Sequence, residues 1–128
     1  MALGMAQYLA NNLFDAIGNA TNFNVATPYI QLHTADPGAS GTTAVATENT
    51  RKLISFAGAA GGTITSDTAI TWTSVAGTET FSHYSVFDAA TVGNFLWSDA
   101  LVSSVAVTIG DDFSIASGDV DLAFNLAA

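Results

Sequence analysis

The chain has 128 residues and a formal net charge of −9, and its two basic residues, Arg51 and Lys52, stand against eleven acidic ones. Binding to a nucleic acid or to an anionic membrane depends on several Lys or Arg side chains, so this composition argues against both kinds of partner. The length suits one domain with an adequate core, and the absence of cysteine excludes disulfides and thiolate chemistry.

The first predicted element is an amphipathic helix. Apolar residues recur at every fourth position from Met5 to Ile17, which is the spacing of one helical face. Gly18 is expected to end the helix in a left-handed conformation. We expect residues 1–24 to form this helix and a connector that covers one end of a single domain formed by residues 25–128. Docking of the helix on a partner chain is the alternative.

After residue 24 the apolar pattern changes to period two, and short β-branched or aromatic segments alternate with Gly, Pro, Asn and Asp. This pattern predicts a mainly β fold, an antiparallel β-sandwich of jelly-roll or immunoglobulin-like type with about eight short strands. Ala39–Thr50 has little apolar content and is expected to be an exposed loop. The expected strand segments are Pro28–Thr34, Leu53–Ala57, Thr63–Thr65, Ala69–Thr73, Phe81–Phe87, Phe95–Trp97, Val105–Ile109, Phe113–Ile115 and the alternating residues Val120, Leu122 and Phe124.

Little in the sequence indicates catalysis. His33 and His83 each stand alone in a predicted strand, without the spacing of a metal site, and there is no nucleophile-elbow motif. The glycine-rich segment 58–62 lacks the lysine and the following helix of a phosphate-binding loop. Acidic pairs at 111–112 and at 119 and 121 flank predicted turns, where Asp commonly bonds to backbone N–H groups; calcium binding is the alternative. We expect no catalytic residues, metal or cofactor, and no enzyme activity.

The order of the motifs resembles a family of small bacteriophage virion proteins, often labelled tail-fibre-like or head-decoration proteins. After the N-terminal helix come YIQLHTADPG at residues 29–38, FDAATVGNFL at 87–96 and GDDFSIASGDV at 110–120. The resemblance covers nearly the whole chain. The chain departs from the family pattern in its scarcity of basic residues, so we expect its binding surface to differ from that of the family.

The resemblance implies a non-enzymatic structural protein on the outer surface of a phage particle, assembled as a homotrimer. Because no heptads or fibrous repeats are present, the first hypothesis is a capsid decoration, or cement, protein that bridges and stabilises subunits of the major capsid protein or other virion proteins. The alternative is a tail-tip or short tail-fibre protein that binds a host receptor or polysaccharide. Sugar stacking would then need exposed aromatic rings, for which the candidates are Tyr29, Trp72, Tyr84 and Trp97.

Five residues are predicted to bind a partner. Tyr8, Leu9 and Phe14 belong to the N-terminal helix, and Arg51 and Lys52 follow the loop after the first strand. The two basic residues are the only fixed positive charges, so we expect them to be where an acidic partner would pair with the chain. Simple solvation at the start of a strand is the alternative for this pair.

Overall fold

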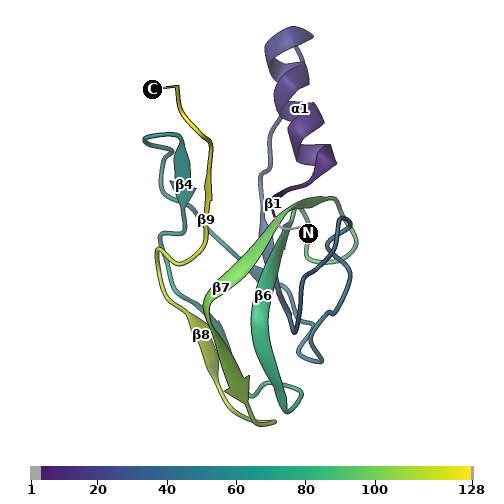
Figure 1. Cartoon of the computed structure of the whole chain (residues 1–128), viewed down its shortest axis with the longest axis vertical. Helices are drawn as coiled ribbons and strands as arrows, with labels where there is room; N and C mark the ends of the chain where they lie inside the picture. The colour runs from purple at the N-terminus through teal and green to yellow at the C-terminus, as the bar shows by residue number, and fades with distance from the viewer. Residues whose placement is uncertain (1–3, 128) are drawn as a thin grey trace.

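A computed structural model describes residues 4–127 of the chain (Figure 1). The predicted mainly β fold, with antiparallel strands and one N-terminal helix, is confirmed. No helix among the described residues combines the length and apolar character that crossing a membrane requires. The elements are β1 (Gly4–Met5), α1 (Gln7–Gly18), β2 (Tyr29–His33), β3 (Lys52–Leu53), β4 (Thr63–Thr65), β5 (Ile70–Trp72), β6 (Glu79–Phe87), β7 (Phe95–Val107), β8 (Phe113–Ile115) and β9 (Asp121–Ala123).

The strands form a sandwich-like arrangement of one large sheet and two small ones. The large sheet has the order β1-β7-β6-β2-β3, and β4 pairs with β9 and β5 with β8. Its centre is the long antiparallel pair of β6 and β7. In β5 the side chains of Ile70 and Trp72 are buried while Thr71 is exposed, as the alternating sequence predicts.

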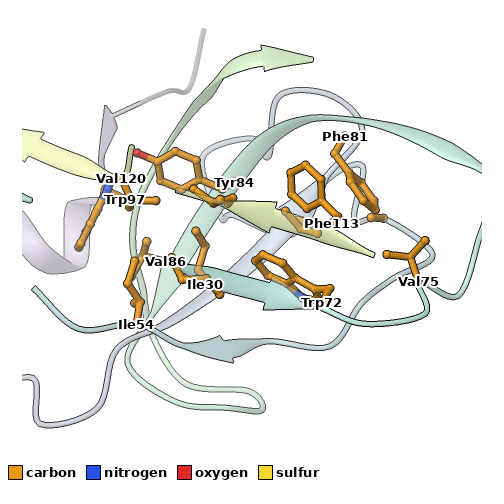
Figure 2. Packing of buried hydrophobic residues seen from close by; sticks show 14 of the residues in the cluster. Ile30, Ile54, Trp72, Val75, Phe81, Tyr84, Val86, Trp97, Phe113 and Val120 are labelled. Carbon is orange, nitrogen blue, oxygen red and sulfur yellow. The ribbon is translucent and has the colours of Figure 1, made fainter. Parts of the chain in front are cut away.

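The core lies between the large sheet and the β5–β8 pair (Figure 2). The ring of Phe81 on β6 packs 4.9 Å from that of Phe113 on β8, measured between centroids, and the Trp72 ring lies 5.9 Å from Phe113. The indole N–H of Trp72 donates a 2.8 Å hydrogen bond to the Thr50 carbonyl, so this buried ring leaves no polar atom unpaired.

Strand β7 corrects a prediction, because the sequence pattern indicated two separate strands, at Phe95–Trp97 and Val105–Ile109. The structure has one strand here, and its pairing with β6 shifts register: Phe81 lies opposite Val105, but His83 lies opposite Ala100. The intervening residues 101–104 contain no Gly, Pro, Asn or Asp that would turn the chain, so they bulge outward instead of ending the strand.

The helix boundaries also differ from the prediction. Met5 pairs with Trp97 in β1, so α1 begins at Gln7. Gly18 remains inside the helix, and the left-handed conformation falls on Ala20, with a φ of 53°. The backbone bonds from the N–H groups of residues 19 and 21 to the Asp15 carbonyl close this end of the helix without a glycine cap.

The predicted exposed loop Ala39–Thr50 has no regular element but is only partly exposed. Ala46 and Glu48 are 4% and 7% exposed. The Glu48 carboxylate accepts hydrogen bonds from the backbone N–H groups of Thr50 and Ala76, at 3.2 and 3.0 Å. The loop therefore packs on the domain through backbone-directed bonds that hydropathy alone does not reveal.

Candidate assembly surface

An apolar groove separates helix α1 from the β4–β9 pair, which both project from one end of the molecule (Figure 1). Its main hollow has a volume of about 390 Å³. None of the side chains that line it carries a charge; they include Leu9 and Leu13 of α1, Ile64 of β4, Trp97 of β7, and Leu122 and Phe124 at the end of β9. In a chain of net charge −9, a hollow of this size without any carboxylate is a candidate binding surface.

A second hollow, of about 380 Å³, continues the groove along the outer part of α1. Its lining is apolar and shares Leu13 and Phe124 with the first hollow. Phe14 and Ile17, which also line it, are 70% and 84% exposed. The two hollows therefore form one apolar surface, which we call the α1 groove.

Helix α1 is held on the domain mainly at its beginning. The Ala6 N–H donates a 2.7 Å hydrogen bond to the Leu96 carbonyl of β7, and Leu9 is the one buried residue of the helix. Toward its end the apolar stripe continues through Phe14 and Ile17, which the domain leaves uncovered. An isolated helix of 12 residues is marginally stable in water, so its last turns gain stability if their apolar face is covered.

The opposite wall is the short pair of β4 and β9. The Phe124 N–H bonds to the Gly62 carbonyl and extends the pair by one step. Leu126 packs against Gly62 so closely that a Cβ atom on this glycine would lie 2.6 Å from a Leu126 methyl carbon. Phe124 and Leu126 nevertheless remain 54% and 63% exposed, so this wall also presents uncovered apolar side chains.

Of the five predicted partner-binding residues, the structure places three near this surface. Leu9 lines the main hollow but is only 7% exposed, and Phe14 lines the second. Tyr8, 37% exposed, makes an edge-to-face contact with Phe23, another residue of the main hollow. The C-terminal wall, with Phe124 and Leu126, was not predicted; apolar residues that continue beyond the last strand were its only sequence signal.

Arg51 and Lys52 do not line the α1 groove. The Arg51 guanidinium lies 3.7 Å from the centre of the Phe87 ring, and its Nη1 donates to the carbonyls of Ala89 and Val92 at 2.9 and 2.7 Å. Desolvation lowers the pKa of Arg51 from its ordinary value, and the nearby Asp88 opposes that shift. Arg51 thus stabilises the loop between β6 and β7. An ion pair between Arg51 and an acidic partner would compete with these hydrogen bonds.

A serine–histidine pair lies in the interior. The His33 Nε2 lies 2.7 Å from the Ser85 hydroxyl and its Nδ1 lies 2.8 Å from the Thr43 carbonyl, so Nδ1 carries the proton and Nε2 accepts from serine. His33 and Ser85 are both 0% exposed. Because no substrate can reach this hydroxyl in the folded chain, the pair acts as a structural hydrogen bond.

Of the four acidic residues near the predicted turns, Asp111 makes the expected local bond, accepting from the Thr108 N–H at 2.8 Å. Asp112 accepts from the Ser74 N–H at 2.8 Å and so joins two segments that are distant in the sequence. Within residues 4–127, no group of three or more His, Asp or Glu side chains is placed to hold a metal ion.

The aromatic candidates for sugar binding are largely inaccessible. Trp72, Tyr84 and Trp97 are 1%, 1% and 4% exposed, and Tyr29 is partly buried. Burial also raises the pKa of Tyr84 to about 12, with the charge of Asp99 adding to the shift. These three buried rings stabilise the core and cannot stack on a sugar.

Comparison with known proteins identifies the family. A family model described as Podophage GP4 fiber I protein gp80 matches residues 4–123, nearly the whole chain. A search of curated proteins finds no match. The matched region includes α1, all the strands of the sandwich and both walls of the α1 groove as far as residue 123. The chain therefore belongs to this family of phage fibre proteins and is a structural component of the virion.

Proposed function

We propose that the chain is a non-enzymatic subunit of a phage tail fibre, and that the α1 groove joins it to the rest of the fibre. The observation that carries the proposal is the match to a fibre protein family over residues 4–123. This match favours the tail-fibre alternative of the sequence analysis over the first hypothesis, a capsid decoration protein. The burial of the Ser85 hydroxyl supports a structural role over a hydrolytic one.

Assembly is the part of this function that the geometry supports best. The α1 groove is large, apolar and free of charge, which are properties of surfaces that proteins cover with a partner. The predicted partners are other virion proteins and further copies of the chain, for which a homotrimer remains the expectation from the family resemblance. A fibre subunit needs such contacts because its role is to hold a fixed position among its neighbours.

Immunogold labelling of intact particles tests the proposal. Antibodies raised against the chain should label the appendages of the tail. Label distributed over the capsid shell would contradict a fibre role and would restore the decoration hypothesis. Particles that lack the gene provide the control for antibody specificity.

A second candidate function, contact with the host surface, is favoured by the loop between β6 and β7. Val92 at its tip is 86% exposed and has a φ of 55°, which is strained for a β-branched residue. Arg51 holds the carbonyl of Val92, and Asp88 accepts hydrogen bonds from the backbone and side chain of Asn94. Such strain, fixed by the surrounding bonds, is found where a loop presents a binding residue.

Phage particles carrying Val92→Asp test this second function. If the loop contacts the host, they should adsorb more slowly than the parent while retaining the same amount of the chain in the particle. Adsorption at the parental rate would contradict a role of this loop in host contact.

A further inference from the structure

We propose that the partner in the α1 groove is a second copy of this chain, whose own helix α1 enters the main hollow of the groove through Phe14 and Ile17. The inference rests on the proposed role as a fibre subunit and names the contact between subunits. The inference follows because one molecule carries two surfaces that can fit each other. One is the concave, apolar groove, and the other is the exposed apolar ridge at the end of α1.

The charge of the chain restricts where two copies can touch. With eleven acidic and two basic residues, most of the surface of one copy repels the same surface of another. The α1 groove has no charged lining residue, and Asp15 is the one acid within α1. Burying a carboxylate that lacks a partner is strongly unfavourable, and a second copy can approach here without that cost.

Both sides of the contact expose large apolar side chains. On the helix of one copy, Phe14 and Ile17 are 70% and 84% exposed, and on the groove wall of the other, Phe124 and Leu126 are 54% and 63% exposed. Burying a large apolar side chain is favourable relative to leaving it in water, so covering two of them on each side favours association.

The position of Phe14 and Ile17 gives the direction of the contact. Both residues lie on the last turns of α1, away from the anchor at Ala6 on β7. The main hollow, by contrast, lies between the first half of the helix and the β4–β9 pair, where Leu9 and Ile64 face it. The free end of the helix can thus enter the groove of a neighbour while its own groove receives the helix of another copy. Such head-to-tail contacts build rings or filaments.

Measurement of molar mass in solution by light scattering tests the interface. The unmodified chain should form a multimer of its 13.1 kDa mass. Ile17→Asp should raise the dissociation constant about 30-fold or more, because the added carboxylate would enter a groove with no basic residue. The control is Val102→Asp, on β7 outside the α1 groove, at a residue 78% exposed. It should leave the multimer intact.

The result is decisive in either direction. Circular dichroism establishes that both variants are folded, which is expected because both side chains are largely exposed. A multimer that Ile17→Asp dissociates and Val102→Asp does not supports the proposal. A monomeric parent chain, or a multimer that both variants leave intact, overturns it. Immunogold label on the tail with either of these last results would leave the fibre role standing while removing this contact.

Disulfide trapping identifies the two sides of the contact. The chain has no cysteine, so Ile17→Cys combined with Ala59→Cys introduces one pair, with Ala59 exposed on the lining of the main hollow. Oxidation should give a ladder of linked chains on a denaturing gel, since the bonds join different copies. The control pairs Val102→Cys with Ala59→Cys and should stay monomeric. Absence of a ladder for the 17 and 59 pair, or an equal ladder for the control, would overturn the assignment.

Discussion

Replacing Arg51 by alanine should destabilise the domain far more than the same replacement at Lys52. Both changes remove one of the two positive charges, so their long-range electrostatic effects are alike. Only Arg51 is bound to the loop between β6 and β7, through the carbonyls of Ala89 and Val92 and through contact with the Phe87 ring. The pair of variants therefore isolates the contribution of these contacts.

The expected magnitude follows from the contacts. Each hydrogen bond from a charged donor contributes about 1.5–3 kcal/mol net, and the cation–π contact about 0.5–1 kcal/mol. Arg51 is only partly buried and the contributions are not additive, so we expect Arg51→Ala to lower the free energy of unfolding by about 2–4 kcal/mol. For Lys52→Ala, at a similarly half-buried position whose side chain makes no comparable contact with this loop, we expect less than about 0.5 kcal/mol.

Urea denaturation, followed by tryptophan fluorescence, measures both values. Arg51→Lys is a useful third variant, because it keeps the charge but loses the planar group that reaches two carbonyls at once; it should fall between the other two. Equal losses for Arg51→Ala and Lys52→Ala would contradict a stabilising role of the Arg51 contacts, since the loss of charge alone would then account for the effect.

Three further predictions concern the interior. Phe81→Ala should lower the free energy of unfolding by about 3–5 kcal/mol in urea denaturation, because this ring is 0% exposed in the core; a loss below about 1 kcal/mol would contradict that packing. Burial lowers the pKa of His33 below its ordinary 6.5, so below pH 6.5 the unfolded state binds a proton that the folded state excludes and the melting temperature should fall. In His33→Gln the melting temperature should decline less steeply with falling pH. An unchanged slope would mean that other titrating groups cause the decline. Gly41→Ala should destabilise the chain more than Gly61→Ala in the same urea assay: both glycines have positive φ, but only at Gly41 does the new methyl group meet a buried ring, that of Phe95, so equal losses would argue against that packing.

Strand pattern and turn chemistry predicted most of the sandwich. The alternation of Ile70, Thr71 and Trp72 placed β5 and its buried face correctly, because period two follows directly from the geometry of a strand. The continuity of β7 was missed because polar residues interrupt the apolar pattern between its two ends, namely Ser98, Asp99, Ser103 and Ser104. Only the pairing with β6, which absorbs residues 101–104 as a bulge, makes these ends one strand.

The candidate site was predicted in part. The apolar period of α1 indicated Leu9 and Phe14, which line the α1 groove, but periodicity does not say which residues of a stripe the domain leaves uncovered. The second wall, around Phe124, could not be predicted because it depends on a long-range pairing between residues 63–65 and 121–123. The bonds of Arg51 to a loop about 40 residues further along are likewise a product of the fold.

Electron cryo-microscopy of the intact phage particle would show where the chain lies and what covers its α1 groove. We expect density for the chain within a tail fibre, with the groove of each copy closed by helix α1 of a neighbour. Density for the chain on the capsid lattice, or within a fibre with the α1 groove open to solvent, would contradict this expectation.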